Sequence, residues 1–297
     1  MELNLTNKKF NIQELATAIQ TSSLTTLILS GNQIGSSGAQ ILSTALPPTL
    51  STLVLKINGI GPLGAFAILN SNHLTSLDIS GNQVGDAGLG SLVENRNLTF
   101  LDISDNQISS SGALTLSKAL SQNQVLTTLI LDHNKIKDAG TKHLATSLLA
   151  NDTLTLLSLR NNHIGDKGAI AIAPFLNGPL TRLVLSDNNI GDEGGEELYR
   201  SLITNQSVID VRENQISERI MKKIIHIRKL QYLVDLIKEK NKIEPETHTS
   251  ELTRQLYKEA PEDLIKSVIK FLFSKSKSKS KTRTKTKAKM RPKSKTV

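Results

Sequence analysis

One eleven-residue pattern recurs eight times along this chain of 297 residues, and it constrains the fold more than any other feature. The pattern is Leu-x-x-Leu-x-Leu-x-x-Asn-x-Ile, and consecutive copies lie 24 to 28 residues apart. Its asparagines are Asn32, Asn58, Asn82, Asn106, Asn134, Asn162, Asn188 and Asn214. A fixed period of this length is typical of a solenoid, in which each unit packs only on its neighbours. The repeats therefore predict one long stacked surface without an obvious reaction pocket.

Each repeat reads as a short strand, a turn and a helix, so the fold class is α/β. In the unit 154–176, Leu157 and Leu159 flank Ser158, which is the alternation of a half-buried strand. Asp166 stands where a side chain would cap a helix, and we expect it to accept a backbone N–H at the start of its own helix. Gly168 recurs in nearly every repeat. We expect it to let the helix start pack closely against the strand layer.

The eight asparagines call for a structural explanation. The chain turns out of the strand at these positions, which leaves backbone groups that water cannot reach. A buried amide side chain can donate and accept hydrogen bonds at once. Stacked on its neighbours, each asparagine can satisfy those groups, and losing one would cost roughly 1–3 kcal/mol. We interpret the set as a structural asparagine ladder; a ladder that binds a ligand is the alternative.

Both ends of such a stack need caps, because a terminal repeat has no neighbour to cover it. Residues 1–23 hold a truncated repeat with its own helix, and residues 24–216 hold the eight full repeats. Apolar residues at helical spacing predict a helix over about 217–242, followed by short helices at about 250–259 and 261–273. We predict that residues 217–273 form a helical C-terminal cap and extension over the open end of the solenoid.

The net charge of +9 is concentrated at the C-terminus. Residues 274–297 carry 11 Lys and Arg and no acidic residue, whereas residues 1–216 carry 13 basic against 18 acidic residues. This tail of lysine, serine and threonine has almost no apolar content, so it is predicted to be disordered. Three roles stay open: binding nucleic acid or acting as a nuclear address, binding anionic lipid, or serving as a solubilising or secretion-related terminus. Without aromatic residues between the lysines, nucleic-acid binding would be non-specific.

The candidate binding surface consists of strand residues that point away from the core. The apolar members are expected on adjacent strands, and the arginines beside one another toward the C-terminal half. Apolar anchors ringed by arginine are favoured at interface hot spots, which predicts protein binding. In the alternative, β-branched and aromatic residues simply suit strands and the charges are solvated. The candidates are Phe100, Asp102, Ile130, Asp132, Leu156, Arg160, Arg182 and Arg212.

The sequence offers no catalytic or cofactor motif. The absence of cysteine excludes disulfides, thiolate metal sites and a cysteine nucleophile. The six histidines show no metal-ligand spacing, and no phosphate-binding loop or nucleophile elbow is present. The N-terminal segment does not read as a secretion signal, and no stretch approaches the ~20 apolar residues of a membrane span. We expect an intracellular monomer that is not an enzyme and needs no cofactor.

The pattern resembles leucine-rich repeat proteins of the ribonuclease-inhibitor-like class, both in the asparagine motif and in the stretch Ile164-Gly165-Asp166-Lys167-Gly168-Ala169. The resemblance covers about residues 3–216. It implies a curved horseshoe with parallel strands on the concave face and helices on the convex face. The regular repeats, with lysine-rich and asparagine-rich segments, look like effectors of intracellular bacterial pathogens, which implies a virulence role in the host cytosol or nucleus. Ubiquitin ligases among those effectors use a catalytic cysteine, which this chain lacks.

These observations lead to one main function and two alternatives. The main hypothesis is a non-catalytic module that binds a protein, by resemblance a host protein, through the concave face. The first alternative is a regulator of a host enzyme, such as a GTPase-activating or inhibitory protein. Ran GTPase-activating relatives carry an acidic tail, however, whereas this tail is basic. In the second alternative the repeats are a scaffold, and the basic tail binds nucleic acid or an anionic membrane.

Overall fold

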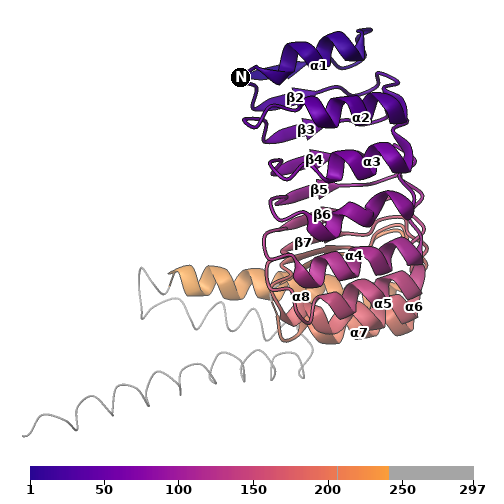
Figure 1. The fold of residues 1–297 in the computed structure, drawn as a ribbon. Helices are drawn as coiled ribbons and strands as arrows, with labels where there is room; N and C mark the ends of the chain where they lie inside the picture. The colour runs from indigo at the N-terminus through magenta and orange to yellow at the C-terminus, as the bar shows by residue number, and fades with distance from the viewer. Residues whose placement is uncertain (206, 241–297) are drawn as a thin grey trace, which may run out of the picture. The chain divides into compact units, whose positions relative to one another are not determined.

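The computed structural model describes residues 1–205 and 207–240, of which Met1–Met221 form one compact unit. Nine parallel strands of this unit form one open sheet in sequence order (Figure 1). The predicted solenoid is thereby confirmed, including the partial first repeat, which supplies β1. The strands are β1 (Glu2–Asn4), β2 (Thr26–Ile28), β3 (Thr52–Val54), β4 (Ser76–Asp78), β5 (Phe100–Asp102), β6 (Thr128–Ile130), β7 (Leu156–Ser158), β8 (Arg182–Val184) and β9 (Val208–Asp210).

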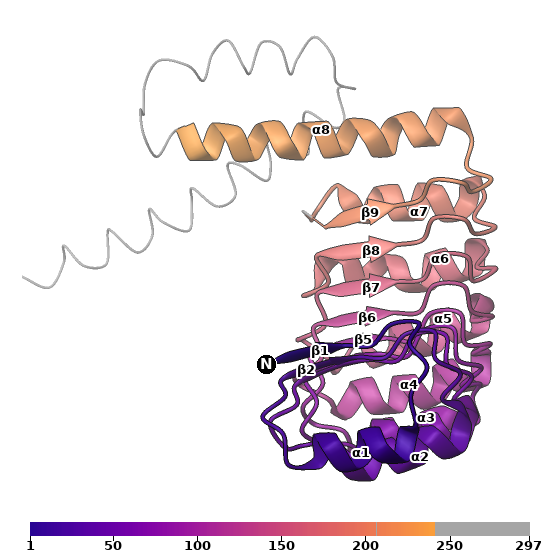
Figure 2. The same cartoon turned by 90° about the horizontal axis from the view of Figure 1, so that it is seen from above.

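A helical segment follows each strand, and those that follow β1 to β8 lie on the opposite side of the unit from the sheet (Figures 1 and 2). Two of the segments are 3₁₀ helices: η1 replaces the α-helix of its repeat, and η2 continues directly from α6. The segments are α1 (Ile12–Gln20), α2 (Gly35–Ala45), α3 (Gly61–Leu69), η1 (Ala87–Glu94), α4 (Ser110–Gln122), α5 (Lys137–Ser147), α6 (Asp166–Ile172), η2 (Ala173–Asn177), α7 (Asp192–Leu202) and α8 (Glu218–Lys240).

The spacing of the two layers explains why the strands line the concave side. Neighbouring parallel strands lie about 4.8 Å apart, whereas packed helices need about 8–10 Å. Because each repeat contributes one of each, the array bends toward its strands. The central leucine of every strand from β2 to β8 is fully buried, as Leu157 and its neighbour Leu159 illustrate at 0% exposure. The residues on either side of that leucine therefore point outward, as the alternation predicted.

In the predicted asparagine ladder, Asn134 shows the contacts that one such residue makes. Its Oδ1 accepts the backbone N–H groups of Asn106 at 3.1 Å and Ile108 at 2.9 Å in the preceding repeat. Its Nδ2 donates to the carbonyls of Ile103 at 3.1 Å and Leu131 at 2.9 Å. A third, longer bond from Nδ2 reaches the carbonyl of Asp132 at 3.3 Å, so one side chain that is 3% exposed joins two repeats with five bonds.

A second, shorter ladder, which was not predicted from the sequence, lies where η1, α4 and α5 return to the next strand. Asn123 accepts the N–H groups of Val125 and Leu126 and donates to the carbonyl of Asn95. Asn151 repeats the arrangement and donates to the carbonyl of Asn123 at 2.7 Å. The 28-residue spacing of these three asparagines was the available signal.

The expectation for Asp166 was wrong. The N-cap of its own helix is Gly165, which makes no side-chain cap bond. Asp166 instead accepts the N–H groups of Gly191 at 2.7 Å and Gly194 at 2.9 Å, at the start of α7 in the next repeat. The helix N-terminus attracts an anion, and the neighbouring repeat supplies it. The carboxylate therefore links two repeats rather than capping one.

The role expected for the recurrent glycine needs the same correction. A Cβ added at Gly168 would lie 2.6 Å from Ile164 Cγ2, 2.8 Å from Asp138 Oδ1 and 3.2 Å from the Asp138 Cα. Asp138 belongs to the helix start of the preceding repeat and accepts the Gly168 N–H at 3.0 Å. The glycine thus leaves room for the neighbouring helix start and its carboxylate, not for the strand layer.

The C-terminal predictions are tested only in part. The helix expected over about 217–242 is present as α8, whereas its role as a cover of the solenoid stays a prediction. The helices expected at about 250–259 and 261–273 and the basic tail 274–297 lie outside the described residues. Among the residues that are described, no helix has both the length and the apolar character needed to cross a membrane.

Candidate functional site

The outward strand residues form three rows across the sheet, because the strands pair in register. The rows correspond to the first strand residue, the third, and the residue two positions later. From β2 to β9 the first row is Thr26, Thr52, Ser76, Phe100, Thr128, Leu156, Arg182 and Val208. The second row is Ile28, Val54, Asp78, Asp102, Ile130, Ser158, Val184 and Asp210. The third row is Ser30, Lys56, Ser80, Ser104, Asp132, Arg160, Ser186 and Arg212.

The three predicted apolar anchors lie on consecutive strands. Phe100 and Leu156 both pair with Thr128, so they occupy the first row two strands apart. Ile130 lies between them in the second row. All three are half-buried, which leaves part of each side chain for contact with another molecule. Two further apolar residues belong to this surface although they were not among the predicted binding residues: Val184, which is half-buried in the second row, and Val208, which is 43% exposed in the first.

Asp102 lies at the edge of the apolar surface beside a second carboxylate. It pairs in register with Asp78, whose Oδ2 forms an ion pair with Lys56 Nζ at 2.9 Å. Asp102 Oδ1 accepts the N–H of Ser104 at 2.9 Å and its hydroxyl at 2.6 Å. Burial raises the pKa of Asp102, and the neighbouring Asp78 acts in the same direction. Lys56 has a raised pKa, chiefly through its hydrogen bond to Asp78.

Asp132, another predicted binding residue, already accepts hydrogen bonds from within the protein. One of its oxygens accepts both the Ser158 hydroxyl at 2.5 Å and the backbone N–H of Arg160 at 3.0 Å. These bonds tie β6 to β7 where the chain turns out of the sheet. The geometry of Asp132 is therefore sufficiently explained by the stacking of the repeats.

The three arginines do not form the single cluster that we expected. Arg182 pairs with Leu156 in the first row, whereas Arg160 and Arg212 lie in the third row with Ser186 between their strands. Side chains on one face of a strand recur every second residue, so the first and third rows lie four residues apart along the chain. In this repeat the two positions are Arg182 and Ser186. The predicted cluster was wrong because the three arginines come from neighbouring repeats, but Arg182 lies in a different row from Arg160 and Arg212.

The surroundings of the arginines differ as well. Arg212 makes two hydrogen bonds to the Asp210 carboxylate, at 2.8 and 2.6 Å. Arg160 Nε lies 3.9 Å from Asp187 Oδ2. Within residues 1–205 and 207–240, the guanidinium of Arg182 makes no hydrogen bond or ion pair, and the residue is exposed. Arg182 is thus the arginine of this surface with a charge left for a partner.

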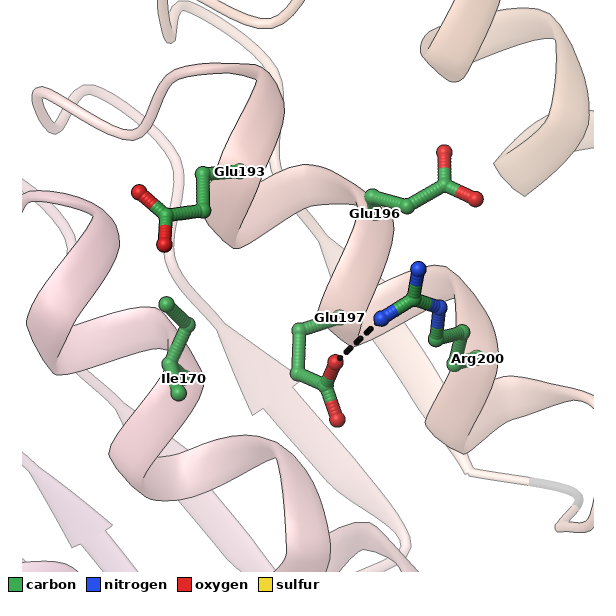
Figure 3. Close-up of a pocket in the computed structure, with 5 residues that line it drawn as sticks. All are labelled: Ile170, Glu193, Glu196, Glu197 and Arg200. Atoms are coloured by element: carbon green, nitrogen blue, oxygen red, sulfur yellow. Dashed lines mark hydrogen bonds and ion pairs between the residues drawn. The ribbon is translucent and has the colours of Figure 1, made fainter.

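A shallow hollow of about 400 Å³ opens on the helical side of the unit, between α6 and α7. Ile170, Glu193, Glu196, Glu197 and Arg200 line it (Figure 3). Arg200 Nη1 pairs with Glu197 Oε2 at 3.1 Å. The lining offers no nucleophile paired with a base. Across the described parts of the chain, no group of three histidine or acidic residues is placed to hold a metal ion.

No curated protein matches the chain. Among solved structures, the chain is similar to leiomodin-1 actin-binding site 2, with 16% identity over 61% of this chain and 94% of that chain and a TM-score of 0.37. A similarity of this size carries no argument about function.

The family comparison identifies the repeats directly. The family model described as leucine rich repeat matches residues 21–43, 70–93, 94–117, 122–145, 150–173 and 177–198. Each matched segment includes one of the strands β2, β4, β5, β6, β7 and β8 and at least part of the helical segment after it. The chain is a leucine-rich repeat protein.

Proposed function

We propose that the chain is a non-catalytic module that binds another protein through the concave strand face. The observation that carries this proposal is the half-exposed apolar surface of Phe100, Ile130 and Leu156, which the stacking of the repeats does not require. For Phe100 and Leu156, the equivalent first-row positions of β2, β3 and β4 hold threonine or serine and leave the fold intact. Apolar side chains at such positions stabilise a complex when a partner removes them from water.

A pull-down from a eukaryotic lysate tests the proposal. The bait variant is Phe100→Ala/Leu156→Ala/Arg182→Glu in the full chain, and its matched control is Thr26→Ala/Thr52→Ala/Ser76→Ala at the other end of the same row. We expect wild type and the control to capture the same protein and the bait variant to lose it while keeping its circular-dichroism spectrum. Equal capture by all three would overturn the proposal.

We further propose that the partner is a host protein and that the chain acts as an effector, in line with its resemblance to ribonuclease-inhibitor-like repeats of intracellular pathogens. A captured host enzyme would also decide whether binding regulates it. Adding the chain to a captured GTPase, for example, should change the rate of GTP hydrolysis if the chain is a GTPase-activating protein. An unchanged rate of hydrolysis would mean that the chain binds the GTPase without activating it.

The basic tail supports a second candidate function. Its 11 positive charges over residues 274–297 suit non-specific binding to nucleic acid or to anionic lipid. Removing residues 274–297 should then abolish binding to DNA or to phosphatidylserine vesicles and leave capture by the concave face intact. Binding that persists after the deletion would exclude the tail as its source.

A further inference from the structure

The first row changes character at β5. Its residues from β5 to β9 are Phe100, Thr128, Leu156, Arg182 and Val208, whereas its earlier residues are small and polar. Arg182 is the charged residue among these five, and its neighbours in the row are Leu156 and Val208. Val184, on the same strand and the same face, is also apolar. The charge of Arg182 therefore lies within an apolar surface.

Neighbouring carboxylates are already engaged. Asp210, on the adjacent strand and one row away, holds Arg212 in two bonds. Asp187 lies beside Arg160 and at the opposite end of the strand from Arg182. A partner that covers Leu156 and Val208 would thus remove the Arg182 guanidinium from water. Desolvating a charge without an opposite charge is costly, whereas a carboxylate pairs with a guanidinium through two parallel hydrogen bonds.

The spacing of the rows selects the shape of the partner. Adjacent strands lie about 4.8 Å apart, and one turn of an α-helix advances 5.4 Å. A helix that crosses the strands along the first row would place successive turns against successive strands. Residues four positions before and after a central residue would then contact Leu156 and Val208 while the central residue faces Arg182.

We propose that this surface binds an amphipathic helix of a partner protein, in which a carboxylate flanked one turn away on each side by apolar residues pairs with Arg182. The inference rests on the proposed function of the concave face and specifies its partner. The carboxylate provides the specificity, and Leu156, Val208 and Phe100 provide the apolar contact. A helix with a basic residue at the central position is excluded by charge repulsion.

Selection from a displayed peptide library tests this inference. The library consists of amphipathic helices of about five turns with leucine at the two flanking positions and all residue types at the central one. The targets are the full chain, Arg182→Glu, and Lys167→Glu as a control with the same charge change at an exposed residue of α6. Because all three carry the same basic tail, attraction of acidic peptides to the tail cancels in the comparison.

We expect wild type and Lys167→Glu to enrich aspartate or glutamate at the central position and Arg182→Glu to enrich lysine or arginine. The selected acidic peptide should bind Arg182→Glu roughly tenfold more weakly than wild type, or weaker still. The same central residues on all three targets would overturn the inference. The variant Phe100→Ala/Leu156→Ala distinguishes failure of this inference from failure of the proposed function. Peptides that require these two residues but show no acidic preference would overturn the inference and leave the proposed function standing. Peptides that bind the variant as well as wild type would overturn both.

Discussion

The asparagine ladder and the first outward row lie on the same strand–turn units, yet their residues follow different rules. The ladder position is asparagine in all eight full repeats, because buried backbone groups of two repeats must find their partners in one side chain. The first row varies from Thr26 to Phe100 to Arg182 at equivalent positions, because these side chains face water and no buried backbone group depends on them for a hydrogen bond. Uniform positions thus maintain the stack, and irregular positions are available for recognition.

The largest effect should come from the centre of the ladder. In Asn134→Ala, two N–H groups of the preceding repeat and three carbonyls lose a partner inside the stack. We expect the free energy of unfolding to fall by roughly 3 kcal/mol, the upper end of the cost of unpaired buried groups. Urea unfolding followed by circular dichroism measures this loss.

A neighbouring asparagine provides the control for that loss. Asn189 follows the ladder residue Asn188 directly, but its side chain is exposed. Asn189→Ala should change the free energy of unfolding by less than about 0.5 kcal/mol. Similar losses in both variants would mean that asparagine is required by the turn itself rather than by the ladder.

The next largest effect should come from the contact between helix starts. In Gly168→Ala the new Cβ would lie too close to Ile164 Cγ2 and Asp138 Oδ1, so the two repeats must separate. Overpacking of this kind costs roughly 1–3 kcal/mol, measurable as a lower urea midpoint. Gly165→Ala is the matched control, because its Cβ would meet the nearest atom, Asp138 Oδ2, at 3.4 Å. An equally large loss in Gly165→Ala would mean that alanine restricts the backbone at both positions and that close packing is not the cause.

Removing the carboxylate from that contact should cost less than crowding it. Asp138 accepts the N–H groups of Gly165 at 2.7 Å and Gly168 at 3.0 Å. Asp138→Ala should therefore lose roughly 1 kcal/mol, as other helix-capping side chains do. Asp138→Asn keeps an oxygen acceptor at this place and should recover most of the loss in the same urea assay. A full loss in the asparagine variant would assign the effect to charge rather than to hydrogen bonding.

The repeats could be predicted from the sequence because their positions recur, and recurrence exposes what the backbone demands. Asp166 shows the limit: its spacing to the helix is that of a cap, and only the stacking distance between repeats decides that it reaches Gly191 instead. Arg182 shows another limit. Its place in the first row follows from the register, but the period does not reveal that Asp210 pairs with Arg212 and that, among the described residues, the Arg182 guanidinium makes no ion pair. Side-chain pairing across strands is set by geometry that no repeat period encodes.

The smallest effect concerns the outward rows themselves and has the opposite sign. Burial raises the pKa of Asp102, so the folded state binds its proton more tightly than the unfolded chain does. Its contribution to stability is therefore present at low pH and is lost as the pH rises through the raised value. Asp102→Asn keeps the oxygen that accepts from Ser104 and should stabilise the chain slightly near pH 7, by less than about 0.5 kcal/mol.

That gain should disappear toward about pH 3, where the wild-type carboxyl is protonated in both states. Asp192 provides the contrast, because the hydrogen bond that it accepts from the Ser217 backbone N–H at 2.6 Å lowers its pKa. A group with a lowered pKa stabilises the fold above its unfolded value and loses that contribution as the pH falls, so Asp192→Asn should be less stable near pH 7 and equal to wild type in acid. Urea midpoints measured across this range should therefore diverge in opposite directions for the two variants. Parallel curves would mean that Asp102, like Asp192, stabilises the stacked repeats. The distinction between residues that maintain the stack and residues available for recognition would then not hold at Asp102.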